Sequence, residues 1–144
     1  MVAIRTATLD DIAALTLLMD DLGYPTTVEE MRTRFSDING HPDYRTLVAI
    51  TEAGEIGGMI GLIKSYYFEH NGMYIRVGAL VVGKDHRNKG IGKILMLEAE
   101  KWALDIGAHT ILLNSGNRDE RVAAFAFYEK MGYSIKSSGF VKVI

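Results

Sequence analysis

The sequence ALVVGKDHRNKGIGK, residues 79–93, contains the most informative pattern of the chain. Its first four residues are continuously apolar, which predicts a strand buried on both faces. A glycine-rich turn follows, and apolar residues at helical spacing begin at Ile91. Free backbone N–H groups and the positive end of the helix dipole would converge at this junction, where Arg87, Lys89 and Lys93 add charge. The pattern predicts an anion site that suits a pyrophosphate.

Two common nucleotide-binding motifs do not match this turn. A P-loop needs Ser or Thr directly after its Lys, whereas Ile94 follows Lys93. A dinucleotide-binding turn needs a third Gly where Leu95 stands, and an acidic residue about 20 positions further on. Residues 110–115 contain no carboxylate. A dinucleotide-dependent oxidoreductase is therefore disfavoured.

Two capping boxes predict helices before this stretch. Thr8 with Asp11 precedes apolar residues at helical spacing up to Leu22, and Thr27 with Glu30 precedes a second amphipathic segment. Between them, glycine and proline end the first helix.

Strands are predicted where β-branched and apolar runs are bounded by turn residues. After the anion turn, helical spacing continues to Gly107 and is followed by a short strand, a helix and a closing strand pair. The predicted strands cover residues 2–7, 46–52, 56–67, 73–82, 110–114 and a pair within 133–143, with the last helix over 121–131. The order β-αα-βββ-α-β-α-ββ predicts an α/β fold with a mixed sheet, in one domain over residues 1–144.

Composition narrows the classes of function. The chain has no cysteine, so a disulfide framework, a thiolate metal site and a cysteine nucleophile are excluded. Its formal charge of -2, without a Lys or Arg run, argues against a nucleic-acid partner. No apolar stretch reaches the roughly 18 residues of a membrane span, and the first ten residues do not resemble a signal peptide. We expect a soluble cytoplasmic protein without a membrane partner or a metal site.

The spacing Arg-x-x-Gly-x-Gly, formed by Arg87, Gly90 and Gly92, resembles the acetyl-CoA signature of the GNAT superfamily of N-acetyltransferases. Alone, such a turn could equally be a plain connection between a strand and a helix. The resemblance extends over the predicted element order of essentially the whole chain. A later segment, which includes Tyr128 and Gly132, is similar to the family pattern Ala-x-x-x-Tyr-x-x-x-Gly-aromatic.

The resemblance implies acetyl-CoA as cofactor and a splay between strands 4 and 5 of the sheet, here 79–82 and 110–114. The pantetheine arm would lie in this gap and contact backbone groups. One backbone N–H of the fourth strand could polarise the thioester carbonyl. The cofactor-binding residues that the resemblance implies are Leu80, Val81, Val82, Arg87, Asn88, Lys89, Gly90, Ile91, Gly92, Lys93, Asn114, Asn117 and Tyr128. Alternatively, the strand residues are core and the two asparagines cap the next helix.

By the same resemblance, Tyr128 is the general acid that protonates the departing CoA thiolate. A free thiol has a pKa of about 8.5 and a tyrosine a pKa of about 10, so a positioned phenol can donate that proton. Taken without the family spacing, Phe127 and Tyr128 would be plain core aromatics of an amphipathic helix.

The general base is not evident. Many members of the family place a glutamate in the fourth strand, but 73–82 contains no carboxylate. A water chain, Glu69, His70, or binding of an already neutral amine are the alternatives. Five aromatic residues of the first helices and the hairpin could form a wall for a small cation, or a hydrophobic clamp over the sheet. They are Tyr24, Phe35, Tyr66, Tyr67 and Phe68.

The leading hypothesis is direct transfer of an acetyl group from acetyl-CoA to an amine, with a small-molecule acceptor, in a ternary complex. The alternative is a non-catalytic acyl-CoA-binding sensor or interaction module that kept the cofactor site. The sequence does not identify the acceptor or the oligomeric state, and it is compatible with a homodimer.

Overall fold

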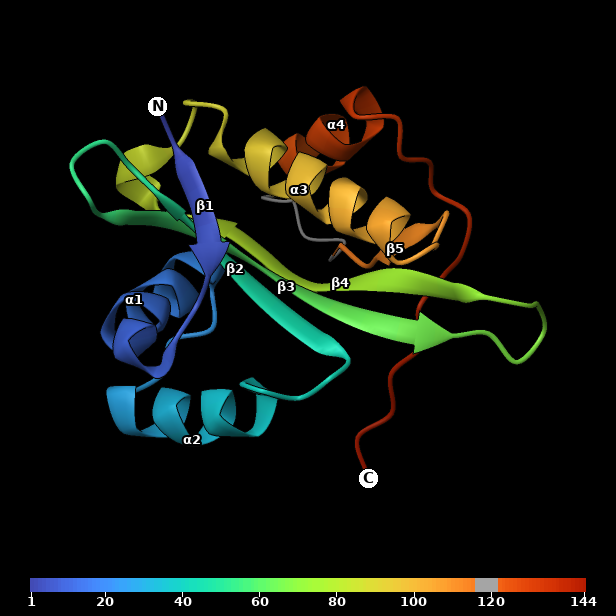
Figure 1. Cartoon of the computed structure of the whole chain (residues 1–144), viewed down its shortest axis with the longest axis horizontal. Helices are drawn as coiled ribbons and strands as arrows, with labels where there is room; N and C mark the ends of the chain where they lie inside the picture. Colours follow the sequence, from blue (N-terminus) through green and yellow to red (C-terminus); the bar gives the residue numbers. More distant parts are fainter. Residues whose placement is uncertain (116–121) are drawn as a thin grey trace. The chain divides into compact units, whose positions relative to one another are not determined.

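The computed structural model describes residues 1–115 and 122–144 (Figure 1). Residues 1–112 and 113–144 form two compact units, and each is described by itself. The elements are β1 Ala3–Thr6, η1 Leu9–Asp11, α1 Ile12–Leu22, α2 Val28–Ile38, β2 Tyr44–Ile50, β3 Ile56–Tyr66, β4 Met73–Val82, η2 Lys84–His86, α3 Ile91–Asp105, β5 Ile111–Leu113 and α4 Val122–Lys130. No helix among the described residues is both long and apolar enough to span a membrane.

The strands form one sheet in the order β1-β2-β3-β4-β5. Neighbouring strands from β1 to β4 pair antiparallel, whereas β5 runs parallel to β4, so the sheet is mixed as predicted. The predicted α/β class is thus confirmed, and the observed bounds of β4 are those expected from the sequence.

Helices cover both faces of the sheet. Met59 of β3 belongs to a buried cluster with residues of α1 and α2. Its neighbour Gly58 faces the other way, toward Ile91 and Leu95 of α3. Successive residues of a strand point to opposite faces, so α1 and α2 lie on one side and α3 on the other (Figure 1).

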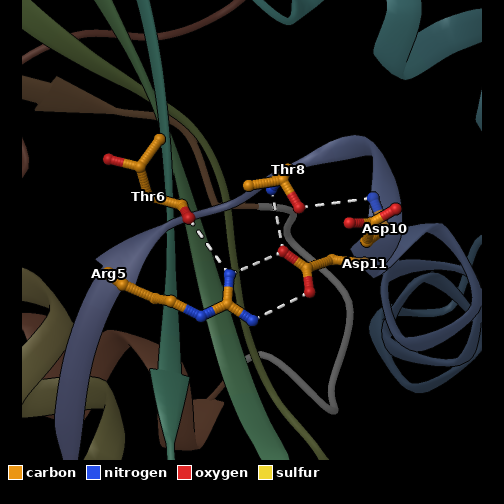
Figure 2. Close-up of polar contacts among 5 residues, drawn as sticks. All are labelled: Arg5, Thr6, Thr8, Asp10 and Asp11. Atoms are coloured by element: carbon orange, nitrogen blue, oxygen red, sulfur yellow. Dashed lines mark hydrogen bonds and ion pairs between the residues drawn. The ribbon is translucent and has the colours of Figure 1, made fainter.

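The first predicted capping box is present and is reinforced by an ion pair (Figure 2). Thr8 donates its backbone N–H to Asp11 Oδ2 at 2.8 Å. Arg5 of β1 approaches the same carboxylate with both terminal nitrogens, Nη1 to Oδ2 at 2.8 Å and Nη2 to Oδ1 at 2.9 Å. The hydrogen bond from Arg5 is the largest cause that lowers the pKa of Asp11. This cluster fixes the start of the first helical segment to the edge of the sheet.

The closing strand pair predicted within 133–143 is not formed, since residues 134–144 have neither helix nor strand. Their apolar side chains are exposed, including Ile135, Phe140 and Val141. A strand needs backbone partners as well as an apolar pattern. Among the described residues of the second unit, the regular elements are α4 and the last residue of β5. Within the described part of that unit, no strand runs beside residues 134–144 that could supply the missing backbone partners.

The fifth strand is much shorter than the fourth. Ile75 near the start of β4 donates its backbone N–H to the carbonyl of Thr110, just before β5, at 3.0 Å. The two strands run in the same direction from this bond, and β5 has three residues against ten in β4. β5 therefore accompanies only the first half of β4. The second half of β4, residues 79–82, is the part for which a splay is predicted.

Candidate functional site

The junction between β4 and α3 leaves the start of that helix uncapped by any side chain. Gly90 occupies the N-cap position in the left-handed conformation, with φ 80°, and makes no side-chain cap. The first helical hydrogen bond runs from the backbone N–H of Ile94 to the carbonyl of Gly90 at 3.1 Å. A Cβ atom built on Gly90 would meet no atom within 4 Å. No side chain thus caps the N–H groups of the first turn, and the space beside Gly90 is open, which suits an anionic ligand.

The side chains of the turn have different surroundings. Arg87, Asn88 and Lys89 are exposed, whereas Ile91 is buried against the face of the sheet that α3 covers. Asn88 also has a positive φ of 63°. The turn therefore presents backbone and polar groups outward while it is anchored by Ile91.

Asp21, at the end of α1, holds this turn in place. Its carboxylate accepts a hydrogen bond from the backbone N–H of Lys84 at 3.1 Å, and its carbonyl accepts one from Arg87 Nη2 at 3.4 Å. Arg87 Nε also donates to the carbonyl of Val82 at 3.3 Å. Sequence reasoning missed Asp21, and it gave Arg87 only a role toward the anion. In this structure the Arg87 side chain also ties the turn to β4 and α1.

Two consecutive glycines in β3 let α3 approach the sheet. A Cβ atom on Gly58 would lie 2.9 Å from the carbonyl oxygen of Val81 and 3.1 Å from Ile91 Cγ2. One on Gly57 would lie 3.1 Å from Ile91 Cδ1. Glycine within a strand commonly marks such a close approach, so these residues carry a signal that the sequence analysis did not use.

The second half of β4 is paired along one edge with β3. Leu80, Val81 and Val82 pair with β3, opposite Ile60, Met59 and Gly58. The register between β3 and β4 skips Gly78, which makes that residue a bulge. A bulge leaves an extra residue unpaired and bends its strand. Backbone groups along the other edge of 79–82 are those expected to contact the cofactor.

A cavity of about 750 Å³ lies between the α1–α2 junction and the middle of β4. Its volume is within the usual range of small-molecule sites. Among the described residues that line it, Arg34 is the one cationic side chain and none is a carboxylate. The lining residues are Met19, Leu22, Gly23, Tyr24, Pro25, Arg34, Gly78 and Ala79.

The five aromatic residues do not form a single wall. Phe35 is buried in the core with α1, which matches the clamp interpretation, and only Tyr24 lines the cavity. Tyr66 and Phe68 are exposed. Tyr67 packs against the rings of His70 and Tyr74, with centroids 5.3 and 4.7 Å away.

The two suggested side-chain bases lie far from the anion turn. Glu69 and His70 belong to the hairpin before Met73, at the opposite end of β4 from Gly83 (Figure 1). A strand rises about 3.3 Å per residue, so roughly 15 Å separates the start of β4 from its bulge. This distance argues against either residue as the base.

In the second unit, Tyr128 lies on α4 among other aromatic residues. Its ring centroid is 5.2 Å from that of Phe127 and 6.1 Å from that of Tyr133, whose backbone N–H bonds to the Tyr128 carbonyl at 3.0 Å. Gly132, with φ 94°, ends the helix as expected. Asn114 is exposed, and Asn117 lies outside the described residues. The roles of Tyr128 and both asparagines stay predictions.

No group of three or more His, Asp or Glu side chains that could hold a metal ion occurs within 1–115 or 122–144. Attention therefore goes to the anion turn, the second half of β4 and the cavity.

Comparisons with known proteins agree with this geometry. Residues 12–133 match the model of the "Acetyltransferase (GNAT) family". A solved GNAT family acetyltransferase of Staphylococcus aureus is 34% identical, with a TM-score of 0.84 over 99% of this chain and 98% of that one.

Two curated relatives match in part. A probable glucosamine 6-phosphate N-acetyltransferase of Drosophila melanogaster is 29% identical over 70% of this chain and 45% of its own length. An uncharacterized N-acetyltransferase of Bacillus subtilis is 37% identical over 52% of each chain. The chain thus spans about half the length of the curated relatives it matches.

The family match covers most of the chain and includes residues of both units, and the sheet is mixed, as the resemblance implies. Members of this family use acetyl-CoA. The chain belongs to the GNAT family of acetyltransferases.

Proposed function

We propose that the protein transfers an acetyl group from acetyl-CoA to the amine of a small molecule, by direct attack in a ternary complex. The observation that carries the proposal is the uncapped N-terminus of α3 at the end of a strand whose second half extends past β5. We also propose that residues 1–144 act as one acetyltransferase domain, since the family match spans both units.

The residues present fit acetyl-CoA. Backbone N–H groups at the start of α3 would hold the pyrophosphate, with Lys89 and Lys93 adding positive charge. The free edge of β4 at 80–82 would bind the pantetheine arm, and one of its N–H groups would stabilise charge that develops on the carbonyl oxygen. When bound, acetyl-CoA supplies the activated acetyl thioester.

The acceptor amine would enter the cavity beside Gly78 and Ala79. An amine with a pKa near about 10.4 must give up its proton before it attacks, at a cost of about 4.6 kcal/mol at pH 7. The lining residues that the structure describes offer no carboxylate for this step. This composition supports proton loss to water, or capture of the small neutral fraction of the amine.

We assign Tyr128 the role of general acid. The experiment that tests the function compares the wild-type protein with a variant that lacks the Tyr128 hydroxyl. Wild-type protein is screened with acetyl-CoA and a panel of amines, and release of free thiol is followed over many turnovers. Tyr128→Phe keeps the ring, so CoA affinity should survive while turnover falls about 10²- to 10⁴-fold. Tyr133→Phe, which also removes one phenol from the second unit, is the matched control and should retain turnover.

Full turnover of Tyr128→Phe, under conditions in which the chemical step limits the rate, would return Tyr128 to the role of a packing aromatic. A loss of equal size in Tyr133→Phe would point to disturbed packing among these rings rather than to proton transfer.

The alternative function is a non-catalytic sensor that binds acyl-CoA. It is favoured by one observation, that neither β4 nor the described part of the cavity lining contains a carboxylate. A sensor would bind CoA without releasing thiol in excess of protein, whatever amine is added. Multiple turnovers with any amine would exclude it.

A further inference from the structure

We propose that Arg34 selects acceptors that carry an anionic group, a carboxylate or a phosphate, in addition to the reacting amine. This inference rests on the proposed transferase function and names the chemical class of its acceptor. Arg34 is the only cationic side chain among the cavity-lining residues that the structure describes.

The guanidinium of Arg34 is held by neutral partners. Nη2 donates to Thr26 Oγ1 at 3.3 Å, and Nη1 contacts Met31 Sδ at 3.8 Å. A guanidinium has five N–H donors in a planar fork that matches carboxylate and phosphate oxygens. Two weak contacts leave most of this capacity for a ligand. They also restrict where the side chain lies at the cavity wall.

Glu30, one helical turn earlier, attracts the Arg34 guanidinium through its charge and reaches it through the Thr26 hydroxyl, but the two form no direct ion pair. Glu30 Oε1 accepts hydrogen bonds from the backbone N–H of Thr27, from its hydroxyl and from the Thr26 hydroxyl, each at 3.2 Å. These bonds belong to the cap of α2, and no ion pair to Arg34 is found among the described residues. The positive charge of Arg34 therefore remains uncompensated by a bonded carboxylate.

The other lining residues indicate how an acceptor would be oriented in the cavity. Met19, Leu22 and Pro25 are apolar, and Gly78 with Ala79 brings the β4 backbone to the opposite side. Arg34 is exposed, so solvent screens its charge, and recognition of an anion would rest on the hydrogen-bond geometry of its planar fork. An acceptor would thus place its anionic group on α2 and its amine toward β4. Among the described lining residues no carboxylate would bind an ammonium group, which leaves the ring of Tyr24 as the group that could attract a cation.

The test uses pairs of amines that differ only in the anionic group. Glucosamine 6-phosphate is compared with glucosamine, and β-alanine with its amide, by free thiol release at saturating acetyl-CoA. Wild-type protein should prefer the anionic member of at least one pair, and the pair concerned identifies phosphate or carboxylate. Arg34→Gln should reduce that preference about 10- to 100-fold, mainly through KM, because a charge-assisted hydrogen bond is lost.

Arg32→Gln is the matched control, because Arg32 lies on the same helix, is exposed and does not line the cavity. It should leave the preference unchanged. Equal use of both members in each pair, or a preference that survives Arg34→Gln, would overturn the role of Arg34 while acetyl transfer itself stands.

If no amine in the panel releases thiol, calorimetry with CoA-loaded protein decides the same question through binding. Tighter binding of an anionic member that Arg34→Gln abolishes would support the inference. Equal binding of both members would overturn it. Failure of the transferase function has a separate signature, which is the absence of CoA binding or of any multiple turnover.

Discussion

The N-termini of α2 and α3 differ in how their unpaired backbone N–H groups are treated. Every helix begins with backbone N–H groups that lack a partner within the helix. At α2, the hydroxyl of Thr27 accepts the N–H of Glu30 at 3.1 Å, and the Glu30 carboxylate accepts the N–H of Thr27 in return. At α3, Gly90 provides no side chain. The comparison shows that one helix start is capped by a side chain, while the other has no side-chain cap and is the one that we assign to a ligand.

The largest expected effect concerns the open helix start. Gly90→Val introduces a side chain into the empty space before α3 and should weaken CoA binding about 100-fold, or about 2.8 kcal/mol, measured by calorimetry. The loss would come from backbone N–H groups that the pyrophosphate no longer reaches.

The control is Gly107→Val at the other end of α3. Gly107 also has a positive φ, 84°, and open space around its Cβ position, so both variants carry similar backbone strain. Unchanged CoA affinity in folded Gly90→Val, or an equal loss in Gly107→Val, would contradict an anion site at the start of α3.

A smaller effect is expected at the closed helix start. Thr27→Ala removes the side-chain cap of α2 and should lower the free energy of unfolding by about 1 kcal/mol, measured in urea. Because this cap serves only stability, CoA affinity should stay the same. A loss of CoA affinity in this variant would show that the two helix starts are not functionally separate.

The smallest effect concerns the first capping box, where Arg5 pairs with Asp11. The folded-state pKa of Asp11 is lowered, so the contribution of this pair is fully present above the unfolded value of about 3.9 and is lost as the pH falls below it. Arg5 is partly exposed, so Arg5→Met should lower the free energy of unfolding by less than about 1 kcal/mol at pH 7.

The difference between wild type and Arg5→Met should shrink in urea titrations at pH 3. A difference that stays constant from pH 7 to pH 3 would mean that apolar contacts of the Arg5 side chain, and not its charge, stabilise this corner.

Features with a local cause could be predicted from the sequence. Both capping boxes depend on residues three positions apart, and both are present. The strand from Met73 to Val82 and the helix that starts at Ile91 follow from the apolar period of neighbouring residues. The closing strand pair was predicted wrongly, because an apolar pattern such as that around Phe140 does not state whether a partner strand is available.

Features that depend on distant contacts were missed. The carboxylate of Asp21 bonds to the backbone of Lys84, 63 positions away, and no local pattern announces such a pair. The cavity and the role of Arg34 depend on the packing of the α1–α2 junction against β4. Of these distant contacts, only the close approach of α3 to β3 could have been predicted, from the two consecutive glycines within a predicted strand.

The position of Asp21 has a consequence for how the two ligands influence each other. This residue bonds to the turn that we assign to CoA, and it is followed directly by Leu22, Gly23 and Tyr24 of the cavity wall. A ligand that repositions the turn would act on the cavity through one residue. Thermodynamic linkage makes any such effect reciprocal, so the factor by which CoA changes acceptor affinity is also the factor by which the acceptor changes CoA affinity. Cooperative binding of CoA and acceptor, whichever binds first, would then depend on a single aspartate at the end of a helix.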